Sequence, residues 1–403
     1  MQNVGQCATN EWNELSLTFC GSYLVVEITL VIVVATALLF DFTNGFHDTA
    51  NAIATVVATK AIKPKTAVIF AAVLNFLGAL VSTSVAATVA TGIVSTGAIT
   101  LEVVLAGLVG AVIWNLITWR FGIPSSSSHA LVGGVAGSAV ALAGTDVVKW
   151  SGLIDKVAIP SLIAPVIGIV GAGLLMLLIA RLIRNKPEDK TNKYFKRLQI
   201  LSGGFVAFTH GTNDSQKTMG VIALALLIVY PQEAFSIPLW VIISAGLAMA
   251  AGTYIGGWRI IHTLGHKITK LESPQGFAAE AATATTLGLT AHFGFPVSTT
   301  HTITGAILGA GAVTQPSLVN WRILKRILIA WLITIPCAGA MGAVAELLTC
   351  LPFGTGLVVL VAGLSISAIV FTRHWTRESI AQVVDLLSVL RRIRSSKKNV
   401  SSK

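Results

Sequence analysis

Charged side chains are scarce in this sequence. Asp, Glu, Lys and Arg together make up 11% of its 403 residues, whereas soluble domains carry roughly 25%. The hydrophobic share is 54%, and the mean hydropathy is +0.79. This composition excludes a soluble globular enzyme and favours a protein that lies mostly within a bilayer.

Cysteine is rare as well. The four cysteines are Cys7, Cys20, Cys337 and Cys350. They form no CxxC pair and no metal-binding spacing with histidine, so neither a zinc site nor a thiol redox centre is indicated. A Cys7–Cys20 disulfide would require export of the N-terminus. No basic region precedes the first apolar run, so a cleaved signal peptide is not predicted, and the first span is expected to act as its own insertion signal.

The sequence instead contains long apolar runs. They cover 24–40, 67–90, 103–119, 121–145, 157–180, 234–258, 281–315, 327–345 and 347–372. About 20 apolar residues cross a bilayer as a helix, and polar, Gly-containing stretches interrupt the pattern at 41–55 and 202–220. The sequence therefore predicts an all-α polytopic membrane protein with roughly ten to twelve membrane segments, some of them broken helices or re-entrant hairpins.

The net charge of +11 lies in short clusters between the apolar runs. Nucleic-acid binding is not expected from such clusters, because their placement is a topology signal. The loop 181–197 has seven basic residues against Glu188 and Asp189, which places it in the cytoplasm. The acidic N-terminus and 232–233 are assigned to the outside. The sequence predicts a multi-pass protein of the cell membrane with its N-terminus outside and its C-terminus in the cytoplasm.

Two motifs occur twice in the same order. FTNGFHD at 42–48 is matched by FTHGTND at 208–214, and FGIPSSSSHALVGGVAG at 121–137 is matched by FGFPVSTTHTITGAILG at 293–309. The charges that flank the two copies are inverted, which predicts two repeats of opposite membrane orientation. Inverted repeats with broken segments are typical of secondary transporters, whose site lies between the repeats near the midplane.

These boundaries divide the chain into five parts. An extracytoplasmic segment covers 1–23, the first membrane repeat covers 24–183, a basic cytoplasmic loop covers 184–198, and the second repeat covers 199–372. The tail 373–403 has apolar residues at helical spacing beside arginines, which predicts an amphipathic interfacial helix. A helix that packs against a partner chain is the alternative.

Asp48 and Asp214 occupy matched positions at membrane depth, where a carboxylate costs roughly 2.5–3.5 kcal/mol. Intramembrane carboxylates are functional by default, although a purely structural pair is the alternative. Titratable groups and cation ligands lie close by in sequence, at Asn44, His47, Asn51, His210, Asn213 and Lys217. Glu280 stands alone in an apolar stretch and is a further candidate, unless it is an interfacial residue.

Hydroxyl residues follow a proline in both PSSSSH and PVSTTH. Proline at a helix start, followed by hydroxyls and free N–H groups, favours an anion cradle for phosphate or sulfate. Close helix packing is the alternative. The predicted substrate residues are Ser125, Ser126, Ser127, Ser128, Ser298, Thr299, Thr300, Asn213 and Lys217. The predicted cation or proton residues are Asp48, Asp214, His47, Asn51, Glu280, His129 and His301.

The sequence resembles the inorganic phosphate transporter (Pit) family over residues 40–372. The similarity lies in GFHDTANA at 45–52, GTNDSQKT at 211–218, the two Pro-Ser/Thr-His motifs and GFAAEAATATT at 276–286. The resemblance implies low-affinity symport of inorganic phosphate, often by a homodimer, without a cofactor or a resident metal. His47 and Lys217 stand where sodium-coupled members generally have Asn, so the chain resembles the proton-coupled bacterial branch.

Several alternatives stay open at this point. They are sodium-coupled phosphate symport, transport of a neutral metal–phosphate complex, a sulfate or other oxyanion permease, and a passive anion channel. Enzymatic activity is not expected, because adjacent helical side chains such as Ser128 and His129 diverge, and because catalytic sites seldom need two matching copies.

Overall fold

A computed structural model describes residues 4–95, 97, 99–231 and 236–367, with side chains from residue 24 onward. The described residues are almost entirely helical, and their only β pairing is a single bridge between Val94 and Val148. This confirms the predicted all-α class. The side chains of Cys7 and Cys20, residues 232–233 and the tail 373–403 lie outside the described part of the structure.

Two compact units make up the chain, with the boundary after Val358. The described part of the second unit is the end of a short helix, Gly354–Ser367. The first unit contains thirteen α-helices among its described residues. They are α1 (Val4–Ala58), α2 (Pro64–Ala79), α3 (Ser84–Gly92), α4 (Leu101–Phe121), α5 (Ser127–Ala143), α6 (Trp150–Leu153), α7 (Ile159–Ile183), α8 (Glu188–Val229), α9 (Leu239–Ile255), α10 (Trp258–His262), α11 (Ser273–His292), α12 (Thr299–Thr314) and α13 (Trp321–Thr349).

Four of the described helices are long and apolar enough to cross a membrane, and the number rises to six if each of two bent pairs is one span. The bent pairs stand at matching places in the two halves. α2 and α3 meet at 71°, and α9 and the segment Trp258–Lys267 meet at 62°. The motif-bearing helices α8 and α11 are not among these spans because polar residues lower their hydropathy.

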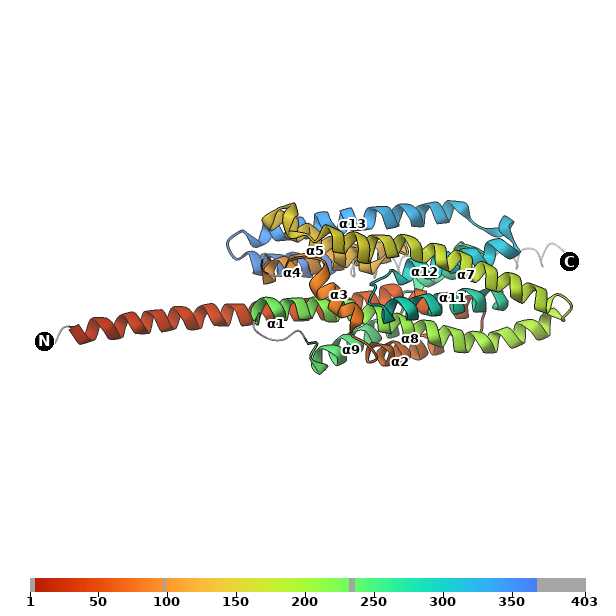
Figure 1. Cartoon of the computed structure of the whole chain (residues 1–403), viewed down its shortest axis with the longest axis horizontal. Coiled ribbons are helices and arrows are strands. Elements are labelled where there is room, and N and C mark those ends of the chain that lie inside the picture. The colour runs from red at the N-terminus through yellow and green to blue at the C-terminus, as the bar shows by residue number, and fades with distance from the viewer. Residues whose placement is uncertain (1–3, 96, 98, 232–235, 368–403) are drawn as a thin grey trace, which may run out of the picture. The chain divides into compact units, whose positions relative to one another are not determined.

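The helices α1 and α8, which carry the first motif pair, run in opposite directions (Figure 1). α1 begins at the left of the view and runs to the right, whereas α8 begins at the right-hand loop and runs to the left. Inverted repeats require this antiparallel relation.

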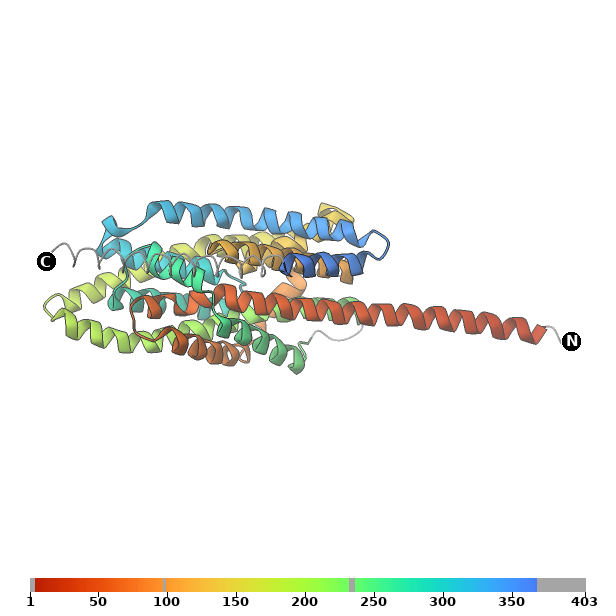
Figure 2. The same cartoon turned by 180° about the vertical axis from the view of Figure 1, so that it is seen from behind.

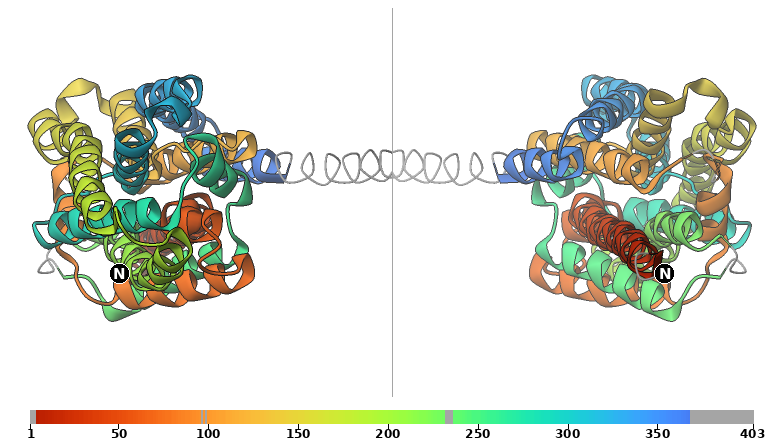
Figure 3. Two further views of the ribbon diagram at one scale, coloured as in Figure 1. Left: turned by 90° about the vertical axis from the view of Figure 1, so that its right-hand side faces the viewer. Right: turned by 90° about the vertical axis from the view of Figure 1, so that its left-hand side faces the viewer.

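Each half packs its helices on the other half. α1 packs on α9, and α8 packs on α2; Figure 2 shows α9, in green, beside α1. In the same way α7 packs on α12 and α11, and α13 packs on α5 and α4, as the blue and gold helices show end-on in Figure 3. The last long helix of each half, α7 or α13, therefore packs on helices of the other half. The two motif pairs meet between the halves.

Glycines allow these exchanged helices to touch through their backbones. A Cβ added at Gly137 would lie 2.2 Å from the carbonyl oxygen of Gly339, and one at Gly309 would lie 2.1 Å from that of Ile169. Such contacts cannot relax by side-chain rotation. The Gly-x-x-x-Gly spacing of α5 and α12 thus serves close packing, which was the alternative interpretation of part of these motifs.

We expect Gly137→Ala and Gly309→Ala to destabilise the protein by about 1–3 kcal/mol or more, the cost of overpacking a dense core. Gly171→Ala on α7 is the matched control, because its nearest neighbour would be the Ala282 Cβ at 3.6 Å. Thermal unfolding of the purified variants measures the difference. An equal midpoint for all three variants would contradict the backbone contacts.

Candidate functional site

The site is built on two helices that each carry an aspartate and, one turn later, an amide or amine. Asp48 and Asn51 lie on α1, and Asp214 and Lys217 lie on α8. Residues three apart face the same side of a helix. All four side chains are buried, with exposed fractions of 3% or less. The matched motifs therefore direct four polar groups into the interior from two antiparallel helices.

Asp48 is held by its neighbour on α1 and by a hydroxyl from α5. His47 Nδ1 lies 2.5 Å from Asp48 Oδ1, and Ser127 Oγ donates to Asp48 Oδ2 at 2.9 Å. His47 Nε2 lies 3.1 Å from Thr118 Oγ1 and 3.3 Å from Ser125 Oγ. His47 stands where sodium-coupled members of the family that the sequence resembles generally have Asn. Its ring thus links the Asp48 carboxylate to the first hydroxyl motif.

Asp214 is the centre of the second half of the site. Its carboxylate pairs with the Lys217 ammonium and accepts a hydrogen bond from Thr299 Oγ1 at 3.2 Å. His210 Nε2 lies 3.4 Å from Asp214 Oδ2, the oxygen that accepts from Thr299. Asp214 is thereby surrounded by two groups that can carry positive charge and one hydroxyl.

The two halves are joined crosswise at this point. Lys217 Nζ on α8 donates to Ser128 Oγ of α5 at 2.5 Å and to the Val297 carbonyl at 3.0 Å. Asn51 Nδ2 on α1 donates to Thr299 Oγ1 and Thr300 Oγ1 of α12 at 3.1 and 2.9 Å. α1 and α8 therefore each bind hydroxyls of the other repeat. This pairing brings both hydroxyl motifs close to the aspartates.

The hydroxyl three residues before the histidine of each motif has a different role. Ser126 caps α5 by accepting the His129 N–H at 3.2 Å, and Ser298 caps α12 by accepting the His301 N–H at 3.3 Å. A side-chain acceptor at the N-cap satisfies one of the unpaired N–H groups of the first turn. Among the hydroxyls that follow, Ser127 and Thr299 donate to the aspartates, whereas Ser128 and Thr300 accept from Lys217 and Asn51.

A group of three ligand atoms in this cluster, and a buried amide adjacent to Asp214 in sequence, are open to a ligand. Asp48, His210 and Asp214 place one ligand atom each within 4.8 Å of one another, a spacing that could hold a cation. The amide of Asn213 is buried, and neither its nitrogen nor its oxygen has a hydrogen-bond partner among the described residues. An unsatisfied buried amide is costly unless a bound group or water completes it.

Comparison with known proteins decides the family. The model of the family described as "PHO4: Phosphate transporter family" matches residues 44–342. The chain belongs to the phosphate transporter family. The matched region contains residues 44–48 of the first motif copy, the other three copies in full, and every residue of the cluster described above.

Curated relatives are also named as phosphate transporters. A "Probable low-affinity inorganic phosphate transporter" of Mycobacterium leprae (strain TN) is 51% identical over 317 residues, which are 78% of this chain and 77% of that protein. One of Bacillus subtilis (strain 168) is 45% identical over 326 residues, 80% of this chain and 97% of that protein. A solved structure titled "The sodium-dependent phosphate transporter" has a TM-score of 0.72 and 27% identity, and it covers 79% of this chain and 98% of its own.

In this member of the phosphate transporter family, Glu280 lies apart from the two aspartates. Its carboxylate accepts hydrogen bonds from Gln199 Nε2 at 2.9 Å and from the Ser202 hydroxyl. Thr59, the residue after α1, donates to Gln199 Oε1 at 2.7 Å, so the group joins the end of α1 to α8 and α11. Glu280 is fully buried, whereas the alternative interpretation places it at the membrane interface.

The two motif histidines also lie outside the aspartate cluster. The His129 and His301 rings contact each other edge to face, with centroids 4.8 Å apart, and His301 stacks on Trp331 at 3.8 Å. The ring nitrogens of His129 have no hydrogen-bond partner within the described part of the chain. Both side chains face a cavity between helices and bond to neither aspartate.

Sequence reasoning missed Asp41 of α1. Its side chain is fully buried, and both carboxylate oxygens lack a hydrogen-bond partner among the described residues. It precedes Asp48 by two helical turns, and Asn44 and Asn51 complete a polar stripe at helical spacing. That periodicity, in an otherwise apolar run, was the signal that could have found it.

Proposed function

We propose that this protein is a low-affinity transporter that carries inorganic phosphate together with protons by alternating access. The observation that carries the proposal is the crosswise cluster around Asp48 and Asp214, in which Lys217 of the second repeat binds Ser128 of α5 and Asn51 of the first repeat binds Thr299 and Thr300 of α12. A site shared by two repeats can open to either side when one repeat moves against the other. The family and the names of the relatives support phosphate as the substrate.

The chemistry of the cluster suits a phosphate ion. Hydroxyls, the Asn213 amide and the Lys217 ammonium offer donors to phosphate oxygens. A protonated phosphate can also donate a hydrogen bond to Asp48 or Asp214, which sulfate cannot do. The carboxylates therefore favour phosphate over a sulfate ion of similar shape.

Proton coupling is supported by the surroundings of Lys217. Its ammonium bonds to the Asp214 carboxylate, the Ser128 hydroxyl and the Val297 carbonyl. Oxygens of these three kinds are the ligands of hard metal cations. The ammonium thus occupies the place of a coupling cation, and the site loses the need for sodium. The sodium dependence named for the solved relative belongs to that protein.

Coupling of some kind is required by the membrane potential. A phosphate dianion that enters against 100 mV costs about 4.6 kcal/mol before any concentration gradient. At least two positive charges must therefore accompany each dianion. Asp48, Asp214 and the separate Glu280 are the groups that we propose to bind and release protons during transport, with His47 next to Asp48.

A metal–phosphate complex is a second form of the substrate that the geometry would accommodate. The ligand atoms of Asp48, His210 and Asp214 converge within 4.8 Å, and a divalent ion there would neutralise phosphate. Stimulation of uptake by Mg²⁺ at constant free phosphate, lost in His210→Ala, would support this form.

The proposed location is the cell membrane, with the N-terminus outside and the basic loop between α7 and α8 in the cytoplasm. The cluster of Lys and Arg in that loop supports this orientation. A homodimer is part of the same proposal and rests on resemblance to the family.

The deciding experiment uses purified protein in liposomes with labelled phosphate, under a pH gradient or a sodium gradient imposed separately. We expect saturable uptake with the pH gradient alone. Unlabelled phosphate should compete and sulfate should not. Uptake with sodium alone would reject proton coupling, competition by sulfate would broaden the substrate class, and flux without a gradient dependence would indicate a channel.

We expect Glu280→Gln to slow pH-driven uptake by at least about tenfold, equivalent to 1.4 kcal/mol. The amide keeps the shape of the side chain and its contact with Gln199 but cannot carry a proton. Exchange of internal for external phosphate without a pH gradient should persist. Glu346→Gln, at another buried glutamate, is the matched control; equal slowing in both variants would contradict a specific role for Glu280.

A further inference from the structure

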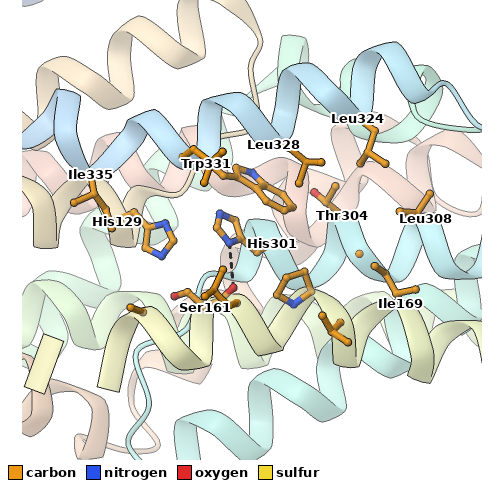
Figure 4. A pocket seen from close by; sticks show the side chains of 16 residues that line it. His129, Ser161, Ile169, His301, Thr304, Leu308, Leu324, Leu328, Trp331 and Ile335 are labelled. Carbon is orange, nitrogen blue, oxygen red and sulfur yellow. Dashed lines mark hydrogen bonds between the residues drawn. The ribbon is translucent and has the colours of Figure 1, made fainter. Parts of the chain in front are cut away.

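A cavity of about 590 Å³ separates α7 and α12 from α13. Its wall is formed mostly by apolar side chains of these three helices, Trp331 among them, and the two motif histidines also line it (Figure 4). The volume is within the range of about 300–1,000 Å³ that is usual for small-molecule sites. The transport mechanism proposed above makes no use of this space.

The mouth of the cavity faces outward from the helix bundle. Leu162 of α7 and Leu332 of α13 line it and are 70% and 75% exposed. In a membrane-spanning bundle, apolar side chains with such exposure face the hydrocarbon of the bilayer. A molecule dissolved in the bilayer can therefore reach the cavity without crossing water.

Polar groups without partners stand at the inner end. His129, Ser161 and His301 are all more than nine-tenths buried. Both ring nitrogens of His129, the Ser161 hydroxyl and His301 Nε2 have no hydrogen-bond partner among the described residues. Buried polar groups are rarely left unpaired in native proteins. The inner end therefore offers hydrogen bonds to a ligand.

The pattern of donors and acceptors narrows the class of ligand. His301 Nδ1 lies 3.4 Å from the Ser161 carbonyl oxygen (Figure 4), which can only accept, so Nδ1 carries the hydrogen and Nε2 of the neutral ring is an acceptor. His129 and the Ser161 hydroxyl can each donate. A ligand O–H group can donate to His301 Nε2, and a ligand oxygen can accept from both His129 and Ser161. A protonated carboxylic acid has both of these features.

We propose that this cavity binds a long-chain carboxylic acid from the bilayer, with its acyl chain along the aliphatic wall and its protonated carboxyl group at His129, Ser161 and His301. No charged side chain lines the cavity, so a zwitterionic phospholipid headgroup would enter without a partner for its charges. A free acid in its neutral form avoids this cost.

The test uses the full-length protein in lipid nanodiscs and palmitic acid that carries a diazirine on its chain. After irradiation, we expect cross-links on the cavity faces of α7, α12 and α13. Unlabelled palmitic acid should compete at least about tenfold better than methyl palmitate, which lacks the O–H donor, a difference of 1.4 kcal/mol.

Variants separate the cavity from the general lipid surface. Leu328→Trp narrows the cavity from α13 and leaves the histidines in place, and it should reduce cross-linking at least fivefold; His301→Phe should abolish the preference for the acid over the ester. Leu347→Trp is the control, because Leu347 is exposed on α13 and does not line the cavity. Equal cross-linking of both tryptophan variants, or equal competition by acid and ester, would overturn the proposal.

Discussion

Asp48→Asn abolishes phosphate uptake driven by a pH gradient, while the protein still inserts and folds. The amide can retain contacts with His47 and Ser127, which now hold the carboxylate at 2.5 and 2.9 Å. It cannot take up and release a proton, so coupling is lost. We expect a fall of at least about 100-fold, which corresponds to 2.7 kcal/mol. Uptake into liposomes under an imposed pH gradient measures it.

Asp146→Asn is the matched control, since Asp146 is an exposed aspartate between α5 and α7. Circular dichroism and size-exclusion profiles establish that both variants fold. Asp214→Asn should lose the same activity, but it also leaves the Lys217 ammonium buried without its partner, which costs about 3–5 kcal/mol. Unchanged uptake by correctly inserted Asp48→Asn protein would reject the proposed role of this carboxylate.

Lys217→Asn should convert the coupling from protons to sodium. The matched residue of the first repeat is Asn51, so the change makes the two repeats alike. It also removes the ammonium from the oxygens of Asp214, Ser128 and Val297, which then can coordinate a metal cation. We expect uptake under the pH gradient to fall at least about tenfold and uptake under a sodium gradient to appear.

Lys217→Met is the control for this switch. It removes the charge and supplies no oxygen, so it should lose pH-driven uptake without gaining a response to sodium. Folding of each variant is checked by thermal unfolding. If Lys217→Asn and wild-type protein responded alike to both gradients, the ammonium would not act as the substitute for a cation.

The internal repeat allows each residue of one motif copy to be compared with its counterpart in the other, and this comparison selects residues that the fold brings together. Asp48, Asp214 and the hydroxyl motifs stand at matched positions, and the structure brings them within hydrogen-bond distance. Periodicity also placed them on helices. Matching two copies of one motif therefore located the residues that meet, without any knowledge of the packing.

Rotation about each helix axis could not be predicted in the same way. Ser126 and Ser127 are neighbours, yet one caps α5 and the other binds Asp48. The sequence groups the histidines that follow the hydroxyls with the coupling residues, but the packing of α5 and α12 places both at the apolar cavity, where His301 stacks on Trp331. Such differences depend on which helix is the neighbour, and a linear motif does not contain that information.

The exchanged positions of α7 and α13 bear on how the protein is made. α7 leaves the ribosome well before α11 and α12, the helices on which it packs. The first half therefore lacks the packing partners of α7 until the second half has been synthesised. We expect a truncated chain that ends in the basic loop to be a substrate for membrane quality control, because its unpaired helix faces stay exposed.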